Sequence, residues 1–492
     1  MPQGFHIENF GCRAARADGE ALASGLSNLG LASNPMQSSE VVIVNTCSVT
    51  AEADREARAY IRRTHRLNPE ARILVTGCYA QRAPQELAAI EGVSAVVGNS
   101  HKAFAPQIAF NLAVGTSNTA NSIIPISSIT NSGANIWADD AFAHSFLAEA
   151  QVLPGLQTRP NLKIQEGCSN RCTFCVIPQT RGNSRSLPAE SVLGQVRNFV
   201  AAGGNELVFS GINLGRWGRD LDAKPTLAAL VRTILTEAAL PRLRLSSIEP
   251  MDWNADLIAL FREFLPTRLA RHAHLPLQSG SDAVLRRMHR RYRPWHYVEK
   301  VAALSAACPD LPSGDTLTLG ADVMAGFPGE TEAEFTETYE LIRALPFGYL
   351  HLFPFSPRPG TRAGELHRQS PVPPRVVGER MSVLRALARE KMRSHRQSMI
   401  GRTLEAITLH TPDALAKEGH TAALTQNFLP VEIQNVEAQS TEARNGDSRC
   451  IEANRLLEVH ITGLTDDLAL TATCSIHPNP TAHVSSRLHA HS

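Results

Sequence analysis

The chain has 492 residues, of which 43% are hydrophobic and 19% charged, and its formal net charge is +1 at pH 7. This length exceeds what one hydrophobic core usually holds, so we expect about three or four domains. No run approaches the roughly 18 apolar residues of a membrane helix, and the N-terminus lacks the basic and apolar regions of a secretory signal. The composition is that of an ordinary folded protein, and we expect neither a membrane span nor secretion but a cytoplasmic location.

Residues 1–110 alternate short apolar runs with segments of helical composition, which is typical of a parallel sheet flanked by helices. The expected strands are Phe5–Phe10, Val41–Thr46, Ile73–Thr76 and Val93–Val97, and the expected helices are Asp18–Leu29, Ala51–Arg66 and Ala83–Ile90. Residues 111–160 are rich in Asn, Ser, Thr and Ala, and this composition predicts a long, partly ordered linker.

Strand–helix alternation returns in residues 161–360. The expected strands are Leu162–Gln165, Glu206–Gly211, Arg242–Ser247, His272–Leu277, Leu319–Ala325 and Tyr349–Phe355. The expected helices are Ala189–Ala202, Thr226–Glu237, Asp282–Arg290, Tyr297–Ala307 and Glu332–Leu345. Six such units in series predict an α/β fold with a six-unit barrel or partly open barrel, and in such folds the functional site lies at the carboxyl ends of the strands.

The C-terminal part of the chain changes character. Residues 372–399 predict one long basic helix, which completes a domain of residues 161–399. In residues 400–475 short β-like runs, such as Thr403–Leu409 and Leu456–Thr462, predict a small all-β module. We expect residues 476–492 to be a disordered tail.

Three of the nine cysteines form a C-x3-C-x2-C pattern directly after the first expected barrel strand: Cys168, Cys172 and Cys175. Three thiolates on one loop can ligate three irons of a [4Fe–4S] cube and leave the fourth iron without a protein ligand. A structural zinc site would need a fourth ligand and usually paired C-x2-C knuckles. For Cys308, Cys450 and Cys474 we expect only small buried hydrophobic side chains.

This spacing, with Phe174 just before the last cysteine, resembles the signature of radical S-adenosylmethionine enzymes. Gly203–Glu206 resembles the family's motif for the methionine amino group of the cofactor, and Gly320–Thr331 resembles its fifth-strand motif near the adenine. The resemblance implies a [4Fe–4S] cluster on Cys168, Cys172 and Cys175 and a bound S-adenosylmethionine. The side chains that it implies for contact with S-adenosylmethionine are Phe174, Glu206, Ser247 and Gln278.

Three further cysteines, Cys12, Cys47 and Cys78, are far apart in the sequence, but each follows an expected strand of the N-terminal domain. The carboxyl ends of parallel strands meet at one edge of a sheet, where open α/β sheets bind their ligands. We therefore expect these three thiols to converge and to form a second three-cysteine cluster site. The alternative is three ordinary buried cysteines.

The sequences around these cysteines resemble the N-terminal domain of the methylthiotransferases. They are Gly11-Cys12, Asn45–Thr50 and Gly77–Gln81. That family joins this domain to a radical S-adenosylmethionine barrel and an RNA-binding β-module called TRAM, which Thr425–Val431 weakly resembles. The chain departs from the family at Ala15, where an Asn is usual, and in its long linker. The resemblance implies two [4Fe–4S] clusters, the second on Cys12, Cys47 and Cys78.

The resemblance implies radical insertion of a methylthio group at carbon 2 of an adenine. Leu162–Cys168 and Arg244–Pro250 resemble the type that acts on N6-threonylcarbamoyladenosine next to the tRNA anticodon, and Arg290, Arg291 and Arg293 are candidates for binding its carboxylate. The alternatives are N6-isopentenyladenosine in tRNA, or a non-catalytic iron–sulfur protein that binds RNA. An electron donor that the sequence does not identify is also implied.

Three Arg-rich runs in a near-neutral chain favour a polyanionic partner, although any single run is typical of a solvated helix face. Phosphate contacts from Arg and Lys supply most non-specific affinity for nucleic acids. The runs therefore suit a tRNA partner. They span Arg55–Arg66, Arg286–Arg293 and Arg375–Arg396.

Overall fold

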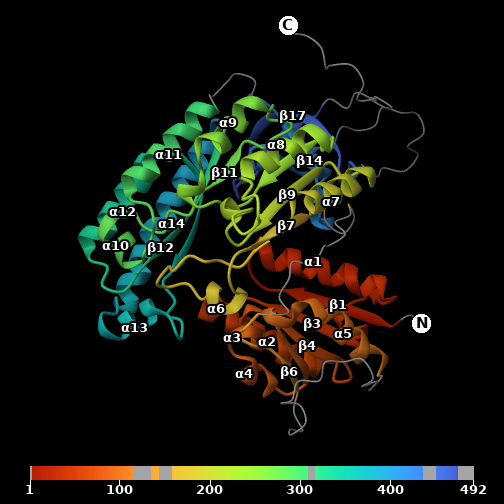
Figure 1. Cartoon of the computed structure of the whole chain (residues 1–492). Coiled ribbons are helices and arrows are strands. Elements are labelled where there is room, and N and C mark those ends of the chain that lie inside the picture. The colour runs from red at the N-terminus through yellow and green to blue at the C-terminus, as the bar shows by residue number, and fades with distance from the viewer. Residues whose placement is uncertain are drawn as a thin grey trace, which may run out of the picture.

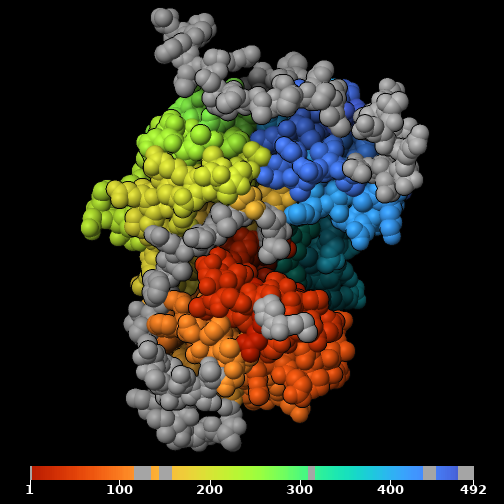
Figure 2. Space-filling model, turned by 90° about the vertical axis from the view of Figure 1, so that its right-hand side faces the viewer, coloured from red at the N-terminus to blue at the C-terminus, as the bar shows by residue number. Residues whose placement is uncertain are grey.

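The computed structural model describes residues 3–115, 134–142, 154, 158–308, 316–435 and 450–474. Figure 1 shows the N-terminal domain, in red to orange, beneath a larger half-barrel in yellow to teal, with a small blue β-module beside the half-barrel. Figure 2 shows from the side that the blue module lies at the end of the molecule away from most of the N-terminal domain. No helix among the described residues is long and apolar enough to cross a membrane.

The N-terminal domain is a parallel sheet with the strand order β2-β1-β3-β4-β5-β6, as the strand–helix alternation predicts. Its strands are β1 (Gly4–Asn9), β2 (Ala32–Ser33), β3 (Val41–Thr46), β4 (Arg72–Gly77), β5 (Val93–Gly98) and β6 (Asn135–Trp137). Its helices are α1 (Arg13–Asn28), α2 (Ala51–Leu67), α3 (Cys78–Arg82), α4 (Pro84–Ala88) and α5 (Ala105–Val114). One apolar core joins α1 and α5 to one face of the sheet, and a second joins α2, α3 and α4 to the other.

Two differences from the expected elements concern the edges of this domain. Helix α1 begins at Arg13 rather than Asp18, because Cys12 has extended backbone at the helix N-cap and the helix starts directly after it. Within the range expected to be a linker, β6 pairs in parallel with β5 and completes the sheet. The other linker residues from 116 to 157, apart from 134–142 and 154, lie outside the described residues.

Six parallel strands form the half-barrel, in two sheets that share one apolar core with the surrounding helices. The strands are β7 (Asn161–Glu166), β9 (Glu206–Gly211), β10 (Arg242–Leu245), β11 (His272–His274), β12 (Thr318–Ala325) and β13 (Phe347–Pro354), and the two-residue β8 (Arg185–Ser186) pairs antiparallel with β7. The helices are α6 (Ile177–Arg181), α7 (Ala189–Ala201), α8 (Leu227–Glu237), α9 (Ala255–Glu263), α10 (Asp282–Arg287), α11 (Pro294–Ala307), α12 (Glu332–Ala344) and α13 (Arg362–Gln369). The expected α/β half-barrel is confirmed.

The C-terminal part consists of the long helix α14 (Pro374–Gln397) and a closed five-stranded barrel, so the small all-β module is also confirmed. Its elements are β14 (Thr403–Thr408), α15 (Asp413–Lys417), β15 (His420–Thr425), β16 (Pro430–Gln434), β17 (Leu456–Leu464) and β18 (Leu470–Thr473). The tail expected to be disordered lies outside the described residues.

The β-module is held against the amino ends of β9 and β10. Arg242 pairs with Glu405 of β14, and Arg244 donates to the carbonyl of Thr425 at 3.1 Å. Asn454 of the module donates to the carbonyl of Gly203 at 2.8 Å, just before β9. These contacts orient the loop between β15 and β16 towards the half-barrel.

A buried ionic network joins the N-terminal domain to the half-barrel. Asp18 of α1 pairs with Lys102, with Lys163 of β7 and with Arg181 of α6, the last at 3.1 Å. Arg181 also pairs with Glu166 at 2.8 Å. Burial alone would raise the pKa of Glu166, but Arg181 and Lys163 lower it to about 2. In the same way burial would raise the pKa of Asp18, but Lys102, Lys163 and Arg181 hold it below its usual range. Both carboxylates of the network are therefore charged at neutral pH.

Replacing Asp18 with Asn should destabilise the protein by about 3–5 kcal/mol, because the buried Arg181 and the half-buried Lys102 and Lys163 would lose their shared carboxylate. Urea unfolding of the iron-loaded protein, followed by circular dichroism, measures the change. Glu52→Gln is the matched control: its pair with Arg55 is exposed, and such pairs contribute at most about 1 kcal/mol. Equal, small losses for the two variants would contradict a network that holds the domains together.

Candidate functional site

The loop between β7 and α6 carries Cys168, Cys172 and Cys175 at the carboxyl end of the first half-barrel strand. Gly167 precedes it with a φ of +70°, and a side chain there would lie 2.0 Å from the carbonyl oxygen of Asn183, so the loop needs glycine at this turn. The loop is closed by hydrogen bonds from the amide of Cys168 to Gly182 and from that of Cys175 to the carbonyl of Cys172. All three thiols are free, as ligation of a cluster requires.

Donor groups surround the thiols of this loop. Cys168 Sγ accepts from the backbone amide of Asn170 at 3.4 Å and from the side-chain amide of Asn213 at 3.6 Å. Arg290 donates to Cys172 Sγ at 3.3 Å. Burial raises the pKa of Cys175 to about 12. N–H donors stabilise thiolate sulfur, so the environment fits an iron–sulfur cluster whose binding displaces the thiol protons.

The second cysteine trio has the arrangement that the sequence predicts. Cys12 follows β1, Cys47 follows β3 and Cys78 begins α3 directly after β4. The three strands are neighbours and run in parallel, so all three thiols lie at one edge of the sheet. Burial, followed by the neighbouring thiols of Cys78 and Cys12, raises the pKa of Cys47 to about 12. The three thiols are thus close enough to act on one another electrostatically.

Two glycines allow the trio to converge. Gly11 has a φ of +108°, and a Cβ there would lie 2.8 Å from Cys47 Sγ. Gly77 has a φ of +98°, and its Cβ would lie 2.3 Å from the carbonyl oxygen of Thr46. Both the left-handed backbone and the close approach exclude other residues at these positions.

The two cysteine sites lie on either side of one helix contact. α3, which starts at Cys78, packs against α6, which starts two residues after Cys175. Arg181 of α6 donates to Cys78 Sγ at 3.2 Å, and Asn99 donates to the same sulfur at 3.5 Å. Although burial alone would lower it, Cys78, Glu166 and Asp18 hold the pKa of Arg181 well above its usual range. The ionic network between the domains therefore reaches the second cysteine site.

A cavity of about 460 Å³ opens beside Cys172 at the carboxyl ends of the half-barrel strands. Its wall includes Glu249, which follows β10, and Arg290, which follows α10, and their side chains pair at 2.5 Å. Arg293 also lines it. A carboxylate beside guanidinium groups can bind an ammonium and a carboxylate at once, which are the two charged ends of an amino acid.

The structure separates one of the four side chains expected to contact S-adenosylmethionine from the other three. Phe174 lies in the cysteine loop, and Ser247 and Gln278 follow β10 and β11, all at the carboxyl ends of their strands. Glu206 is the first residue of β9, about 16 Å of strand away from that edge. Its carboxylate is already paired with Arg159, Arg242 and Arg244. The geometry therefore corrects the expectation that Glu206 binds the cofactor: the glutamate is part of the contact with the C-terminal module.

The arginines expected to bind the substrate carboxylate are mostly engaged with carboxylates of the chain itself. Glu249 pairs with Arg290 beside the cysteine loop, so this arginine already has an anion. Other members of the Arg286–Arg293 run are paired in the same way: Arg287 with Glu334, and Arg286 and Arg293 with Asp282. Glu249 and Arg290 are 41 residues apart, so no local pattern in the sequence predicts their pairing.

Two family models match this chain. The radical SAM superfamily matches residues 162–342, and an uncharacterized protein family, UPF0004, matches residues 4–98. The threonylcarbamoyladenosine tRNA methylthiotransferase MtaB of Bacillus subtilis (strain 168) is 33% identical over 436 residues, which cover 88% of this chain and 90% of that protein. The chain belongs to the radical S-adenosylmethionine methylthiotransferase family. The family that the sequence resembles is thereby confirmed.

Other relatives carry a different substrate in their names. The tRNA-2-methylthio-N(6)-dimethylallyladenosine synthase of Geobacter metallireducens is 31% identical and covers 84% of this chain and 88% of its own. Among solved structures, the radical S-adenosylmethionine methyltransferase TsrM of Kitasatospora setae matches with a TM-score of 0.50 and 15% identity, over 75% of this chain and 76% of that chain. At this identity the likeness shows only that the two chains share a fold.

Replacing Gly77 with Ala should displace Cys78, because the new methyl group would meet the Thr46 carbonyl. The matched control is Gly30→Ala: Gly30 has a φ of +89° but no atom within 4 Å of the added Cβ, so it isolates the backbone cost of about 1–2 kcal/mol. We expect Gly77→Ala to lose clearly more stability than Gly30→Ala in urea unfolding, and to lose iron. Equal losses and full iron content would show that the close approach at Gly77 is unimportant.

Proposed function

We propose that this methylthiotransferase adds a methylthio group to carbon 2 of N6-threonylcarbamoyladenosine next to the anticodon of tRNA. The observation that carries the proposal is the pair of three-cysteine sites on either side of the α3–α6 contact, combined with a relative of that name matched over 88% of the chain. The alternative substrate is N6-isopentenyladenosine in tRNA, because some relatives are named for the dimethylallyl compound.

The residues present fit the cofactors of such a reaction. Cys168, Cys172 and Cys175 would hold one [4Fe–4S] cluster, and Cys12, Cys47 and Cys78 a second. When bound, the clusters and S-adenosylmethionine supply the radical, the sulfur and the methyl group, which no side chain of the chain supplies. The role of the chain is to bind and orient them and to exclude water around the reacting carbon.

We assign the methionyl group of S-adenosylmethionine to the cavity beside Cys172. In this assignment the ligand replaces the present pairs of Glu249 with Arg290 and of Arg293 with Asp282, so that Glu249 binds its ammonium group and the two arginines bind its carboxylate. The assignment replaces Glu206, and it keeps the ligand at the carboxyl ends of the strands, where half-barrels and barrels bind substrates. Phe174, Ser247 and Gln278 stay in the proposed set for this cofactor.

An exposed arginine stripe on α14 suits tRNA as the partner. Arg385, Arg389 and Arg393 recur every four residues, so they share one face of the helix. All three are exposed, and no carboxylate of the described residues pairs with them. By contrast Arg380 of the same helix is buried against Glu330. Unpaired guanidinium groups on one face are suited to contact phosphates.

Two cysteine triple variants test the number of clusters. We expect about eight irons per chain after anaerobic reconstitution, and about half of them after replacing either Cys12, Cys47 and Cys78 or Cys168, Cys172 and Cys175 with Ala. Only the second replacement should abolish reductive cleavage of S-adenosylmethionine. The control is Cys308→Ala, since Cys308 is buried in the half-barrel core and should leave the iron content unchanged. Full iron content after the first replacement would show that Cys12, Cys47 and Cys78 hold no cluster.

The substrate is decided by supplying tRNAs that differ only in the base next to the anticodon. The iron-loaded protein, S-adenosylmethionine and a chemical reductant are incubated with tRNA bearing N6-threonylcarbamoyladenosine or N6-isopentenyladenosine, and the nucleosides are analysed by mass spectrometry. We expect a methylthio product only from the first. Methylthiolation of the isopentenyl base alone would establish the alternative, and cleavage of S-adenosylmethionine without either product would support a different substrate.

A further inference from the structure

The inner face of the sheet β11-β12-β13 is polar, which is unusual for the interior of a half-barrel. Ala273, Ala321 and Val323 belong to the apolar core that packs against the helices. Because side chains alternate along a strand, their neighbours point to the opposite face. These neighbours are His272, His274 and Asp322. On β13, Tyr349 and His351 are paired with Gly320 and Asp322, and the ring of Tyr349 stacks with those of His272 and His274.

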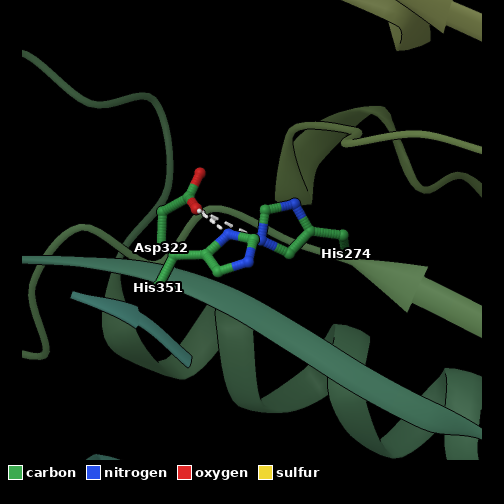
Figure 3. A group of neighbouring side chains, drawn as sticks. All are labelled: His274, Asp322 and His351. Atoms are coloured by element: carbon green, nitrogen blue, oxygen red, sulfur yellow. Dashed lines mark hydrogen bonds and ion pairs between the residues drawn. The ribbon is translucent and has the colours of Figure 1, made fainter. Parts of the chain in front are cut away.

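His274, Asp322 and His351 form a compact group on this face (Figure 3). Both imidazoles point towards Asp322, whose Oδ1 lies 3.3 Å from His274 Nε2 and 3.2 Å from His351 Nδ1. Two histidines and a carboxylate at this spacing are a familiar metal-ligand set. The surroundings argue against a cation, however, because guanidinium groups lie on the same side.

One of these guanidinium groups belongs to Arg13, the residue directly after Cys12. Its Cζ lies 5.1 Å from the ring centre of Phe428, and it is close enough to Tyr349 and Asp322 to interact with them electrostatically. Arg244 lies on the same ring at 5.4 Å. Arg13 comes from the N-terminal domain, Phe428 from the β-module and Tyr349 from the half-barrel, so all three parts of the chain meet here.

Arg13 has no anionic partner of its own in the part of the chain that the structure describes. Asp322, the acid that acts on it electrostatically, is already shared by His274 and His351. Arg244 is better compensated, since Glu206 pairs with it at 2.9 Å, but its Nη1 is buried without a hydrogen-bond partner. A half-buried, unpaired guanidinium is costly unless a ligand provides the missing negative charge.

The charges around Arg13 favour binding of an anion. Four guanidinium groups, those of Arg13, Arg159, Arg242 and Arg244, face three carboxylates, those of Glu206, Glu405 and Asp322. Burial, and then Arg244 and Arg13, lower the pKa of His272 well below its usual range, so this imidazole adds no charge. Arg16 also acts on Arg13, so the cations outnumber the carboxylates, which favours binding of an anionic group such as a carboxylate.

Phe428 has the backbone conformation expected of a functional position. Its φ is +71°, in the left-handed region that a bulky side chain rarely adopts, and such strain is concentrated at binding sites. The hydrogen bonds within Thr425–Leu429 and the packing of the module hold the turn in this shape. The strained turn carries the ring to the contact with Arg13.

We infer that Arg13 binds the carboxylate of the threonylcarbamoyl group and so makes this enzyme specific for that substituent. The inference rests on the proposed function. In adenine, carbon 2 and the carbon that carries N6 both flank N1, so the N6 substituent projects from the same edge of the base as the reacting carbon. A base whose carbon 2 faces the Cys12 site therefore directs its substituent towards the residue next to Cys12. Isopentenyl has no charge and would leave Arg13 unpaired, which disfavours that substrate.

The test compares tRNA bearing N6-threonylcarbamoyladenosine with the same tRNA after methyl esterification of the threonine carboxylate. For the wild-type holoenzyme, we expect the ester to raise KM about 10- to 100-fold, as loss of a charge-assisted hydrogen-bonded pair does. Arg13→Gln should raise KM for the acid by the same factor and erase the difference between acid and ester. Arg13→Lys keeps the charge and should restore part of the preference for the acid.

Arg16→Gln is the matched control, because Arg16 is an exposed arginine one turn further along α1, and neither KM should change. Equal KM values of the wild-type enzyme for the acid and the ester would overturn the inference. A lower KM for the acid than for the ester in the Arg13→Gln variant would also overturn it. If the Arg13→Gln variant does not hold iron, the KM values of the wild-type enzyme and of Arg13→Lys for acid and ester still test the inference. Failure of the wild-type enzyme on both tRNAs, with activity on isopentenyladenosine, would instead refute the proposed function, and the inference with it.

Discussion

The buried network around Asp18 and Arg181 is the interaction on which the arrangement of the two cysteine sites depends. Asp18 comes from α1 of the N-terminal domain, whereas Arg181 and Lys163 come from the half-barrel. Buried charges are stable only when paired, so the two domains are held at the one separation that satisfies all partners. Since Arg181 also contacts Cys78 Sγ, that separation also fixes the second cysteine site against the half-barrel. The network thus controls geometry more than it contributes stability.

Both cysteine sites use the same property of parallel sheets. In each domain the thiols lie just beyond the carboxyl ends of strands, where backbone groups are free of the sheet and the following segments can converge. The half-barrel collects its three cysteines on one loop, and the N-terminal sheet collects them from three neighbouring strands. The contact of α3 with α6 then brings the two edges together. The proposed reaction, which brings two cofactors to one substrate carbon, would use this opposition of edges.

The distribution of arginines shows how far charge in a sequence can mislead. Most arginines of the Arg286–Arg293 run form ion pairs with Glu249, Glu334 or Asp282. By contrast, the stripe on α14 and the single Arg13 have no carboxylate partners among the described residues. Arg13 belongs to no run, so charge density along the chain does not single it out. Its importance follows from where α1 begins, one residue after Cys12, and from the turn that carries Phe428. Local composition therefore predicted a polyanionic partner, whereas the tertiary structure determines which arginines are left without a carboxylate and can bind one.

The sequence by itself determined the half-barrel, the N-terminal sheet, the C-terminal module and the placement of all six cysteines after strands. These features depend on periodicity and on short motifs, which are properties of neighbouring residues. It did not determine the role of Glu206, the pairing of Glu249 with Arg290, or the meeting of Arg13, Phe428 and Tyr349. Such pairs lie from about forty to over four hundred residues apart in the chain, and the direction of β9 places Glu206 at the edge away from the cysteine loop. Only the tertiary structure decides these contacts, because burial and long-range packing, not local sequence, choose which charges must be paired.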